Sequence, residues 1–280
     1  MITRFAPSPT GPLHLGHAYS ALLAHDMARA AGGIFLLRMD DIDRVRSKPE
    51  FEQQAIDDLH WLGLDWPEPI LRQSHSEPRF RAALDRLSDM GLTYPCSCSR
   101  RDIETAAGAP QEGVPSHGPD GRIYPGTCRN RPMHDRRPDD AIRLNMARAL
   151  EAAPPLPAFT ETGPAHAGAH RPDAGDMIRT VGDVVVARKG GGIAYHLSVV
   201  VDDHGQAITD VVRGLDLFDA TRIHTLLFHL LGYPIPRFHH HRLIRDENGK
   251  RLAKRDDARA IARYRAEGAT PGDIRRMVGL

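Results

Sequence analysis

Residues 2–17 read Ile-Thr-Arg-Phe-Ala-Pro-Ser-Pro-Thr-Gly-Pro-Leu-His-Leu-Gly-His, and this stretch decides the fold. The apolar alternation of residues 2–6 predicts a strand, and the prolines and glycine of residues 7–12 predict a loop. Residues 18–31 are rich in Ala, Leu and Met, so they predict a helix, and two glycines follow them. A strand, a tight loop and a helix in this order present backbone N–H groups to a phosphate.

The same alternation of elements continues along the chain. Residues 34–39 form a mostly apolar run that predicts a buried parallel strand, and residues 50–62 predict an amphipathic helix. Strand, helix, strand and helix in succession predict an α/β fold with a Rossmann-like, doubly wound parallel sheet.

Further elements are predicted in the second half of the chain. Residues 181–187 and 193–201 are expected to be paired strands around the glycines of residues 190–192. A helix is expected over residues 220–231 and a strand over residues 239–244, and the 26 residues after Lys254 are expected to be helical.

Changes in amino-acid composition along the sequence suggest four segments. Residues 1–93 are expected to be the first half of the catalytic domain and residues 179–244 the second half. Gly, Pro, Ser and Arg dominate residues 94–137, which contain all three cysteines, and residues 94–178 are expected to be an insertion with a zinc site and an acceptor-contact region. Residues 245–280 are expected to hold a nucleotide loop and a helical segment that contacts an RNA stem.

Composition excludes some classes of protein. The chain of 280 residues has a net charge of +1, so a nucleic-acid partner would need a local basic patch. No apolar run is long enough to cross a bilayer, and no signal-peptide pattern opens the chain. Three cysteines do not suggest a disulfide framework, and we therefore expect a cytoplasmic protein with reduced thiols. We also expect the protein to be a monomer.

Two histidines mark the helix start. His14 and His17 stand three residues apart, so both project from one side of the first helical turn and can donate to phosphate oxygens. Gly11 and Gly16 allow a nucleotide to approach the backbone closely. Taken alone, this pattern could equally be a helix start with two surface histidines.

The longer string around these histidines resembles the first signature of class I aminoacyl-tRNA synthetases, and its flanks resemble the glutamyl and glutaminyl branch. The second signature of that family is a Lys-Met-Ser-Lys-Ser-like loop, which residues 249–255 match in part. Arg251, Ala253 and Arg255 depart from it, whereas Lys254 is retained. The resemblance implies that His14, His17 and Lys254 act with Mg²⁺ on ATP, which forms an acyl-adenylate and releases pyrophosphate.

The resemblance also implies a glutamate pocket. It covers residues 4–8, 38–43, 195–203 and 212–217, which we expect at strand ends, where doubly wound sheets bind ligands. A site that binds free glutamate needs guanidinium donors for the two carboxylates of the substrate and a carboxylate for its ammonium group. The implied binding residues are Arg4, Phe5, Ala6, Pro7, Ser8, Asp40, Tyr195 and Arg213. Asp40 departs from the family, which has glutamate there, and each residue taken singly could be a structural ion pair or loop contact.

Three cysteines suggest a structural zinc site. Cys96, Cys98 and Cys128 supply three thiolates in a segment that metal binding would help to order. The fourth ligand is open from the residues alone, and composition favours a histidine among His117, Asp120, Tyr124 and His134. The resemblance to glutamyl-queuosine tRNA(Asp) synthetases, which carry the same Cys-x-Cys and Tyr-x-x-x-Cys pattern, implies Tyr124. The alternative is three thiols without a metal.

The run His239-His240-His241 could suggest a second metal site. Consecutive residues of a strand point to alternate faces, so the three rings cannot all hold one ion. We expect instead a strand near the nucleotide loop with one imidazole facing inward.

The length of the chain narrows the choice of family members that it resembles. A full glutamyl-tRNA synthetase continues past its second signature with a large anticodon-binding region, whereas here 26 residues follow Lys254. The chain thus resembles the shortened paralogues that activate L-glutamate without tRNA and attach it to queuosine in tRNA(Asp). Two alternatives remain open, namely a discrete glutamyl-tRNA synthetase that charges tRNA ends and an inactive, zinc-stabilised RNA-binding homologue.

Overall fold

The computed structural model of the protein describes residues 1–108, 115–245 and 259–280. The predicted nucleotide loop of residues 249–255, with Lys254, lies outside them. The strands of the described part are β1 (Ile2–Phe5), β2 (Ile34–Met39), β3 (Leu71–Arg72), β4 (Thr93–Cys96), β5 (His117–Gly118), β6 (Gly121–Arg122), β7 (Ala141–Leu144), β8 (Phe159–Glu161), β9 (Gly168–His170), β10 (Val185–Ala187), β11 (Asp210–Gly214) and β12 (Arg237–His241). Its α-helices are α1 (Leu15–Ala30), α2 (Pro49–Trp61), α3 (Glu77–Asp89), α4 (Arg100–Ala107), α5 (Met146–Glu151), α6 (Ala174–Thr180), α7 (Tyr195–Gly205), α8 (Thr221–Leu230), α9 (Ile261–Ala266) and α10 (Pro271–Val278).

The N-terminal strands form a parallel sheet in the order β1-β2-β3. β1 and β2 pair in the register Ile2 to Ile34, and α1 connects them. Gly32 adopts a φ of +60° in the turn after α1. Gly33 passes so close to the chain start that a Cβ there would lie 2.0 Å from the Met1 carbonyl oxygen, so only glycine fits.

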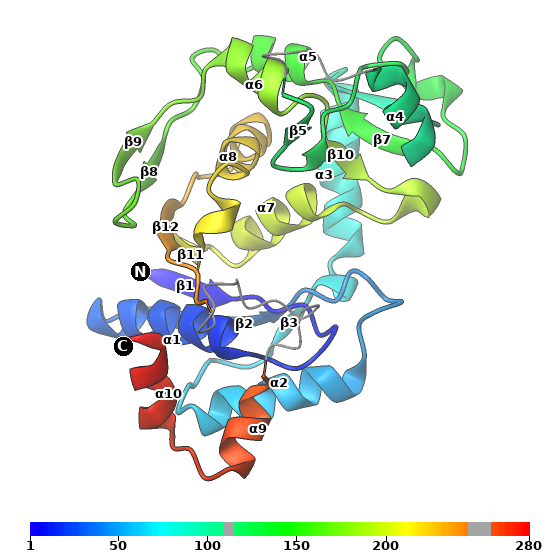
Figure 1. Ribbon diagram of the computed structural model, residues 1–280. Coiled ribbons are helices and arrows are strands. Elements are labelled where there is room, and N and C mark those ends of the chain that lie inside the picture. The colour runs from blue at the N-terminus through cyan, green and yellow to red at the C-terminus, as the bar shows by residue number, and fades with distance from the viewer. Residues whose placement is uncertain (109–114, 246–258) are drawn as a thin grey trace.

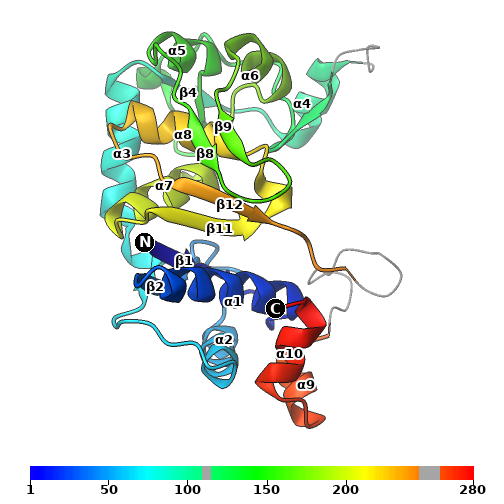
Figure 2. The same ribbon diagram turned by 90° about the vertical axis from the view of Figure 1, so that its left-hand side faces the viewer.

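The second sheet has the order β11-β12-β8-β9, with its first three strands parallel and β9 antiparallel to β8. β1 lies beside β11, where the Thr209 amide donates to the Ile2 carbonyl at 3.0 Å (Figure 2). The parallel strands of the two sheets thus lie edge to edge. α1 packs against β1, β2 and β11, and Figure 1 shows α7 and α8 on the opposite side. The expectation of a parallel sheet covered by helices is confirmed.

The expectation for residues 193–201 was wrong. They do not form a strand, because α7 begins at Tyr195, and the predicted pairing is reduced to one bridge between Ala187 and Ile193. Three consecutive valines suggested a strand, but residues 196–203 are all buried, and burial on every side overrides a β-propensity. Of residues 181–187, only Val185–Ala187 is a strand, and it pairs with β7.

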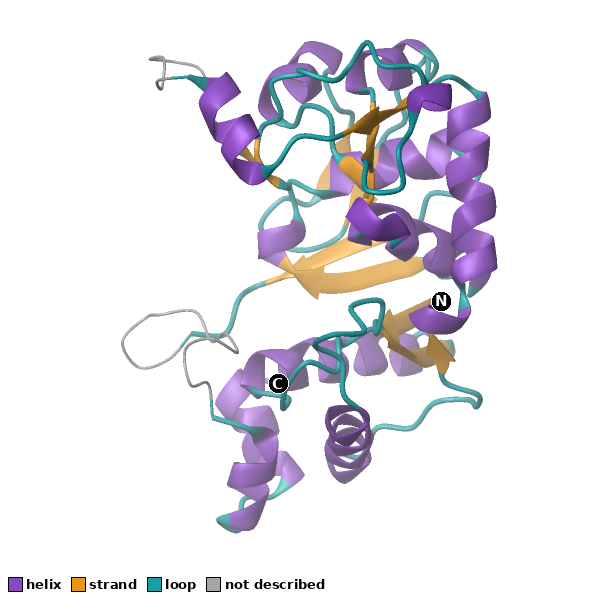
Figure 3. Cartoon of the chain, turned by 90° about the vertical axis from the view of Figure 1, so that its right-hand side faces the viewer, coloured by secondary structure: helices purple, strands orange, loops and turns teal. Residues whose placement is uncertain are grey.

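Residues 94–178 share their sheets with the rest of the chain. β4, β7 and β10 form an antiparallel sheet, and β8 joins β12 in the second sheet. Figure 3 shows strands both in the middle of the molecule and among the helices above it. One hydrophobic core joins apolar side chains of α5, in this segment, to those of α7 and α8 in the second half and of α3 in the first. Segment 94–178 is therefore held to the second half by common sheets and a common core.

Two short helices follow residue 259. α10 packs against α1, and Arg275 donates to both carboxylate oxygens of Asp26 at 2.6 and 2.9 Å. Thr270 caps α10 by accepting from the Asp273 amide, a common helix start. In the parts of the chain that the structure describes, no helix has both the length and the apolar character needed to cross a membrane.

Candidate functional site

A cavity of about 510 Å³ opens where β1, β2 and β11 meet the starts of α1 and α7. This is the edge at which open α/β sheets bind their ligands. It brings together most of the predicted site residues from four separate parts of the sequence. Those lining it are Arg4, Phe5, Ala6, Pro7, Ser8, His14, Gly16, His17, Asp40, Tyr195 and Arg213.

His14 and His17 form a stacked pair at the start of α1. Their ring centroids are 3.8 Å apart, as the spacing of three residues predicts. His14 caps the helix, because its Nδ1 accepts from the Gly16 amide at 3.1 Å, and His17 Nδ1 accepts from the His14 amide at 3.2 Å. A neutral ring that accepts at Nδ1 carries its proton on Nε2, so each Nε2–H is a donor.

The two predicted glycines differ in their placement. A Cβ on Gly16 would lie 3.0 to 3.1 Å from the His14 ring, so a larger residue would disturb the cap. Gly11 is not among the residues that line the cavity. Lys254, the third predicted catalytic residue, lies outside the described residues.

A buried cluster of opposite charges forms the floor of the cavity. Arg4 makes two hydrogen bonds to the carboxylate of Asp203, at 2.9 and 3.2 Å. Arg38 has no exposed surface, and it donates to Asp203 at 2.6 Å and to Asp40 at 2.8 Å. Two guanidinium groups and two carboxylates thus compensate one another away from water, which buried charges require.

The members of this cluster have shifted pKa values. Burial raises the pKa of Asp40, and the Arg38 guanidinium only partly opposes it. Burial also acts to raise the pKa of Asp203, but Arg4 and Arg38 together hold it below its usual range. Asp203 therefore remains a carboxylate, whereas the charge of Asp40 depends on the charges that lie nearby.

Arg213 lies on β11 with a different set of partners. It donates to His240 Nε2 at 3.0 Å, to His224 Nδ1 at 3.1 Å and to the Thr221 hydroxyl at 2.8 Å. Unlike Arg4, Arg213 directly contacts neutral groups in these bonds, so its charge is compensated less closely. Tyr195 lies in the same cavity, and burial raises the pKa of its hydroxyl, although Arg213 lowers it.

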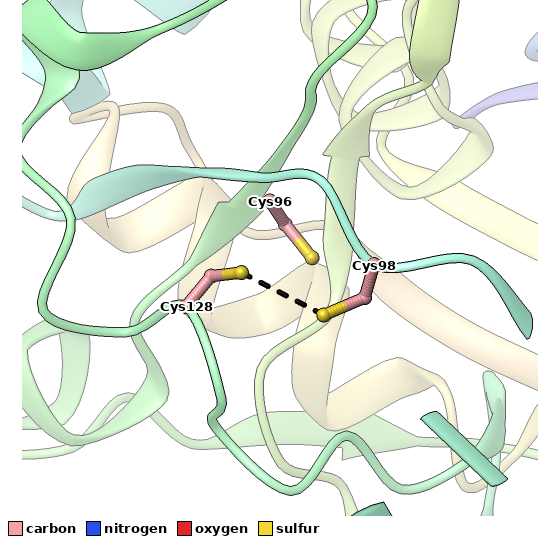
Figure 4. A group of neighbouring side chains, drawn as sticks. All are labelled: Cys96, Cys98 and Cys128. Atoms are coloured by element: carbon pink, nitrogen blue, oxygen red, sulfur yellow. Dashed lines mark hydrogen bonds between the residues drawn. The ribbon is translucent and has the colours of Figure 1, made fainter. Parts of the chain in front are cut away.

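The three cysteines meet at the start of the insertion. Their sulfurs lie within 4.8 Å of one another, and Figure 4 shows the side chains pointing toward a common centre. Cys98 Sγ is 3.6 Å from Cys128 Sγ, and the Tyr124 hydroxyl is 3.4 Å from the sulfurs of both Cys96 and Cys98. Tetrahedral zinc places sulfurs about 3.8 Å apart and a sulfur about 3.5 Å from an oxygen ligand. The four side chains therefore fit a zinc ion.

The other three residues weighed as a fourth ligand lie elsewhere. His134 is 82% exposed and faces Asp135, and His117 bonds Ser116. Asp120 bonds His196 at 3.1 Å. Among the described residues, the close metal-binding group contains no histidine or carboxylate beside the cysteines.

The histidine run occupies β12, and the expectation of one inward ring needs correction. His240 and His241 are both buried, whereas His239 is partly exposed. His240 contacts Arg213 and Glu161, and His241 bonds the Ser20 hydroxyl at 2.6 Å beside the cavity. The ring of His241 is covered by Tyr19 of helix α1, whereas the ring of His240 packs against Phe218 and bonds Glu161 of the neighbouring strand β8.

Sequence reasoning missed several residues of the site. Arg38 lay inside a resembling block but received no role, although it joins Asp40 to Asp203. The available signal was a single arginine inside an otherwise apolar run, at a position where a buried strand was expected. His224 and Glu161 carried no local signal, because their partners are distant in sequence.

Residues 1–136 and 175–280 match the family of tRNA synthetases class I (E and Q), catalytic domain. A glutamyl-Q tRNA(Asp) synthetase of Rhodobacter capsulatus is 62% identical over 283 residues, which cover 100% of both chains. A protein of the same name from Symbiobacterium thermophilum is 45% identical, and the match covers 97% of this chain and 83% of that one.

Solved structures show the same fold. A glutamate-tRNA synthetase from Elizabethkingia anophelis matches 100% of this chain with a TM-score of 0.76 and 24% identity, and 61% of that chain is covered. A glutamate tRNA ligase from Elizabethkingia meningosepticum, in complex with its amino acid, gives a TM-score of 0.74 with 25% identity and 60% coverage. The chain thus spans about three fifths of the length of these two proteins. By sequence and by fold, this chain belongs to the class I family of glutamyl- and glutaminyl-tRNA synthetases.

Proposed function

We propose that the chain activates L-glutamate with ATP, without needing tRNA, and transfers it to the queuosine base in the anticodon loop of tRNA(Asp). The observation that carries the first step is the shared cavity, in which the histidine pair of α1 faces the charged cluster of β1, β2 and β11. The names of the two relatives support the second step.

Activation needs a carboxylate and a triphosphate in line. An oxygen of the glutamate α-carboxylate forms a bond to the α-phosphorus, the bond from that phosphorus to the bridging oxygen breaks, and pyrophosphate leaves. Little proton transfer is required, so positioning and stabilisation of charge dominate. The Nε2–H groups of His14 and His17 suit the phosphate oxygens, and Lys254 would neutralise the leaving group. Mg²⁺ bound to ATP would share that charge.

The glutamate pocket divides into complementary parts. Arg213 is the arginine whose direct partners are neutral, so it is the stronger receptor for a substrate carboxylate. Arg4 is already paired with Asp203 and supplies a second, weaker attraction. Asp40, in the floor of the cavity, would accept from the substrate ammonium, which favours its charged form. Ser8 and Tyr195 would add neutral hydrogen bonds.

The zinc ion would be structural in this account. Cys96, Cys98, Tyr124 and Cys128 enclose the proposed position at one end of the β4-β7-β10 sheet, away from the residues that line the cavity. A closed set of four protein ligands is typical of structural sites.

Exchange of labelled pyrophosphate into ATP tests the proposal. We expect exchange that depends on glutamate and proceeds without tRNA. Exchange that appears only when tRNA is added would favour a discrete glutamyl-tRNA synthetase. The absence of exchange under both conditions would favour an inactive RNA-binding homologue.

A further inference from the structure

A chain of hydrogen bonds joins the insertion to the amino-acid pocket. It begins at Asp120, in the turn between β5 and β6, whose carboxylate lies 3.1 Å from His196 Nε2. His196 Nδ1 lies 3.0 Å from His224 Nε2, and His224 Nδ1 lies 3.1 Å from Arg213 Nη1. The two histidines come from α7 and α8 and are almost fully buried.

Only one arrangement of protons satisfies this chain. An arginine can only donate, so His224 must accept at Nδ1 and carry its proton on Nε2. His196 must then accept at Nδ1 and donate from Nε2, which is the bond that the Asp120 carboxylate accepts. Each contact fixes the next, and Asp120 is the acceptor that orients the whole chain.

The Nε atom of Arg213 is held by a similar series of hydrogen bonds. Arg213 Nε donates to His240 Nε2, so His240 carries its proton on Nδ1 and donates to Glu161. Glu161 is buried, and it also accepts from the amides of Gly163 and His240. Arg213 is thus held between two neutral rings, each of which leads to a carboxylate.

Both rings next to Arg213 stay neutral near pH 7. Burial and the Arg213 charge hold the pKa of His224 well below its usual value, and the same two causes lower that of His240 to about 4. Neutral rings orient the guanidinium without cancelling its charge, as a carboxylate in direct contact would.

We propose that His224 and His196 are positioning residues for Arg213, and that through them Asp120 tunes the affinity of the amino-acid pocket. The proposal rests on the proposed glutamate pocket. Asp120 is 40% exposed at the surface of the insertion, and the two buried rings connect it to Arg213. The insertion is thereby connected to substrate affinity.

The first test compares substitutions of His224 in the pyrophosphate exchange assay. His224→Met removes the acceptor for Arg213 and should raise the KM for glutamate about tenfold or more while the KM for ATP is unchanged. His224→Gln can still accept and donate, so it should restore most of the affinity. Leu227→Met is the control, because Leu227 is a buried residue of the same helix with an apolar side chain. Equal effects of the Met and Gln variants on both substrates would overturn the proposal.

The second test uses Asp120. Asp120→Ala should raise the KM for glutamate about threefold alone, but should have no further effect in the His224→Met protein, because the chain is already broken. Asp139→Ala removes an exposed carboxylate of the same insertion and should change nothing. Additive effects of the first two substitutions would contradict a route through His224.

The third test is independent of activity. Nitrogen-15 chemical shifts of the imidazoles in the intact protein distinguish protonated from bare ring nitrogens. We expect protons on Nε2 of His196 and His224 and on Nδ1 of His240. A proton on Nδ1 of His224 would refute the proposed hydrogen-bond network, even if the protein activates glutamate. Conversely, if these tautomers are found in a protein that shows no glutamate-dependent exchange, the hydrogen-bond network is supported and the proposed function is refuted.

Discussion

Arg38 holds together two carboxylates of the proposed pocket, and its removal should be costly. Arg38→Met keeps most of the volume of the side chain but removes the guanidinium that donates to Asp40 at 2.8 Å and to Asp203 at 2.6 Å. Asp203 keeps its bonds to Arg4, whereas Asp40 loses its buried cation. Breaking a buried pair costs about 3–5 kcal/mol, and domains are stable by only about 5–15 kcal/mol. We therefore expect the free energy of unfolding to fall by about 3–5 kcal/mol.

Urea unfolding of matched variants measures this loss. Arg81 pairs with Glu77 at a similar distance, 2.6 Å, but its side chain is 62% exposed, so Arg81→Met should cost no more than about 0.5 kcal/mol. Arg38→Lys keeps the charge but has a single nitrogen in place of the guanidinium fork that reaches both carboxylates, so its stability should fall between wild type and Arg38→Met. Equal losses for Arg38→Met and Arg81→Met would refute the reasoning.

The pH dependence gives the same prediction a second form. In the wild type, Arg4 and Arg38 outweigh burial and lower the pKa of Asp203. The stability from this carboxylate is present above its unfolded pKa of about 3.9 and is lost as pH falls through the lower folded value. Without Arg38 the pKa of both buried carboxyls rises, so they protonate earlier. The difference between variant and wild type should therefore shrink as pH is lowered from 7 toward 4, and a constant difference would contradict this account.

Four further outcomes are expected. Arg213→Ala should raise the KM for glutamate at least tenfold with little change in the KM for ATP, and unchanged glutamate kinetics would exclude this residue from the pocket. Protein prepared without chelators should contain one zinc by metal analysis. Tyr124→Phe should lower its retention during dialysis against a chelator, whereas equal retention would exclude the hydroxyl as a ligand. Lys254→Ala should abolish pyrophosphate exchange with no change in the urea midpoint, and near-normal exchange would remove Lys254 from the mechanism.

Local patterns predicted the elements that carry their own signals. The strand at Ile2–Phe5 and the helix after His14 follow from an apolar alternation, a breaker-rich loop and strong helix formers. The helix at residues 195–205 did not follow, because three valines favour a strand, and only burial on all sides makes them helical. Secondary structure that tertiary packing decides is beyond a local reading of the sequence.

The candidate site shows the same division. His14 and His17 are close in sequence, so their spacing alone predicted that they share one helical turn. The partners of Arg213 come from α8 and β12 and could be found only in the fold. Resemblance supplied the residues that would touch glutamate, and the structure supplied those that orient them, such as Arg38 and His224.

Transfer of labelled glutamate to tRNA tests the central claim most directly. Purified protein, ATP and labelled glutamate are incubated with tRNA(Asp) that contains queuosine and with the same tRNA made without it. The account predicts label on the queuosine-containing tRNA and none above background on the other. Equal labelling of both tRNAs, in a linkage to the terminal ribose, would contradict it.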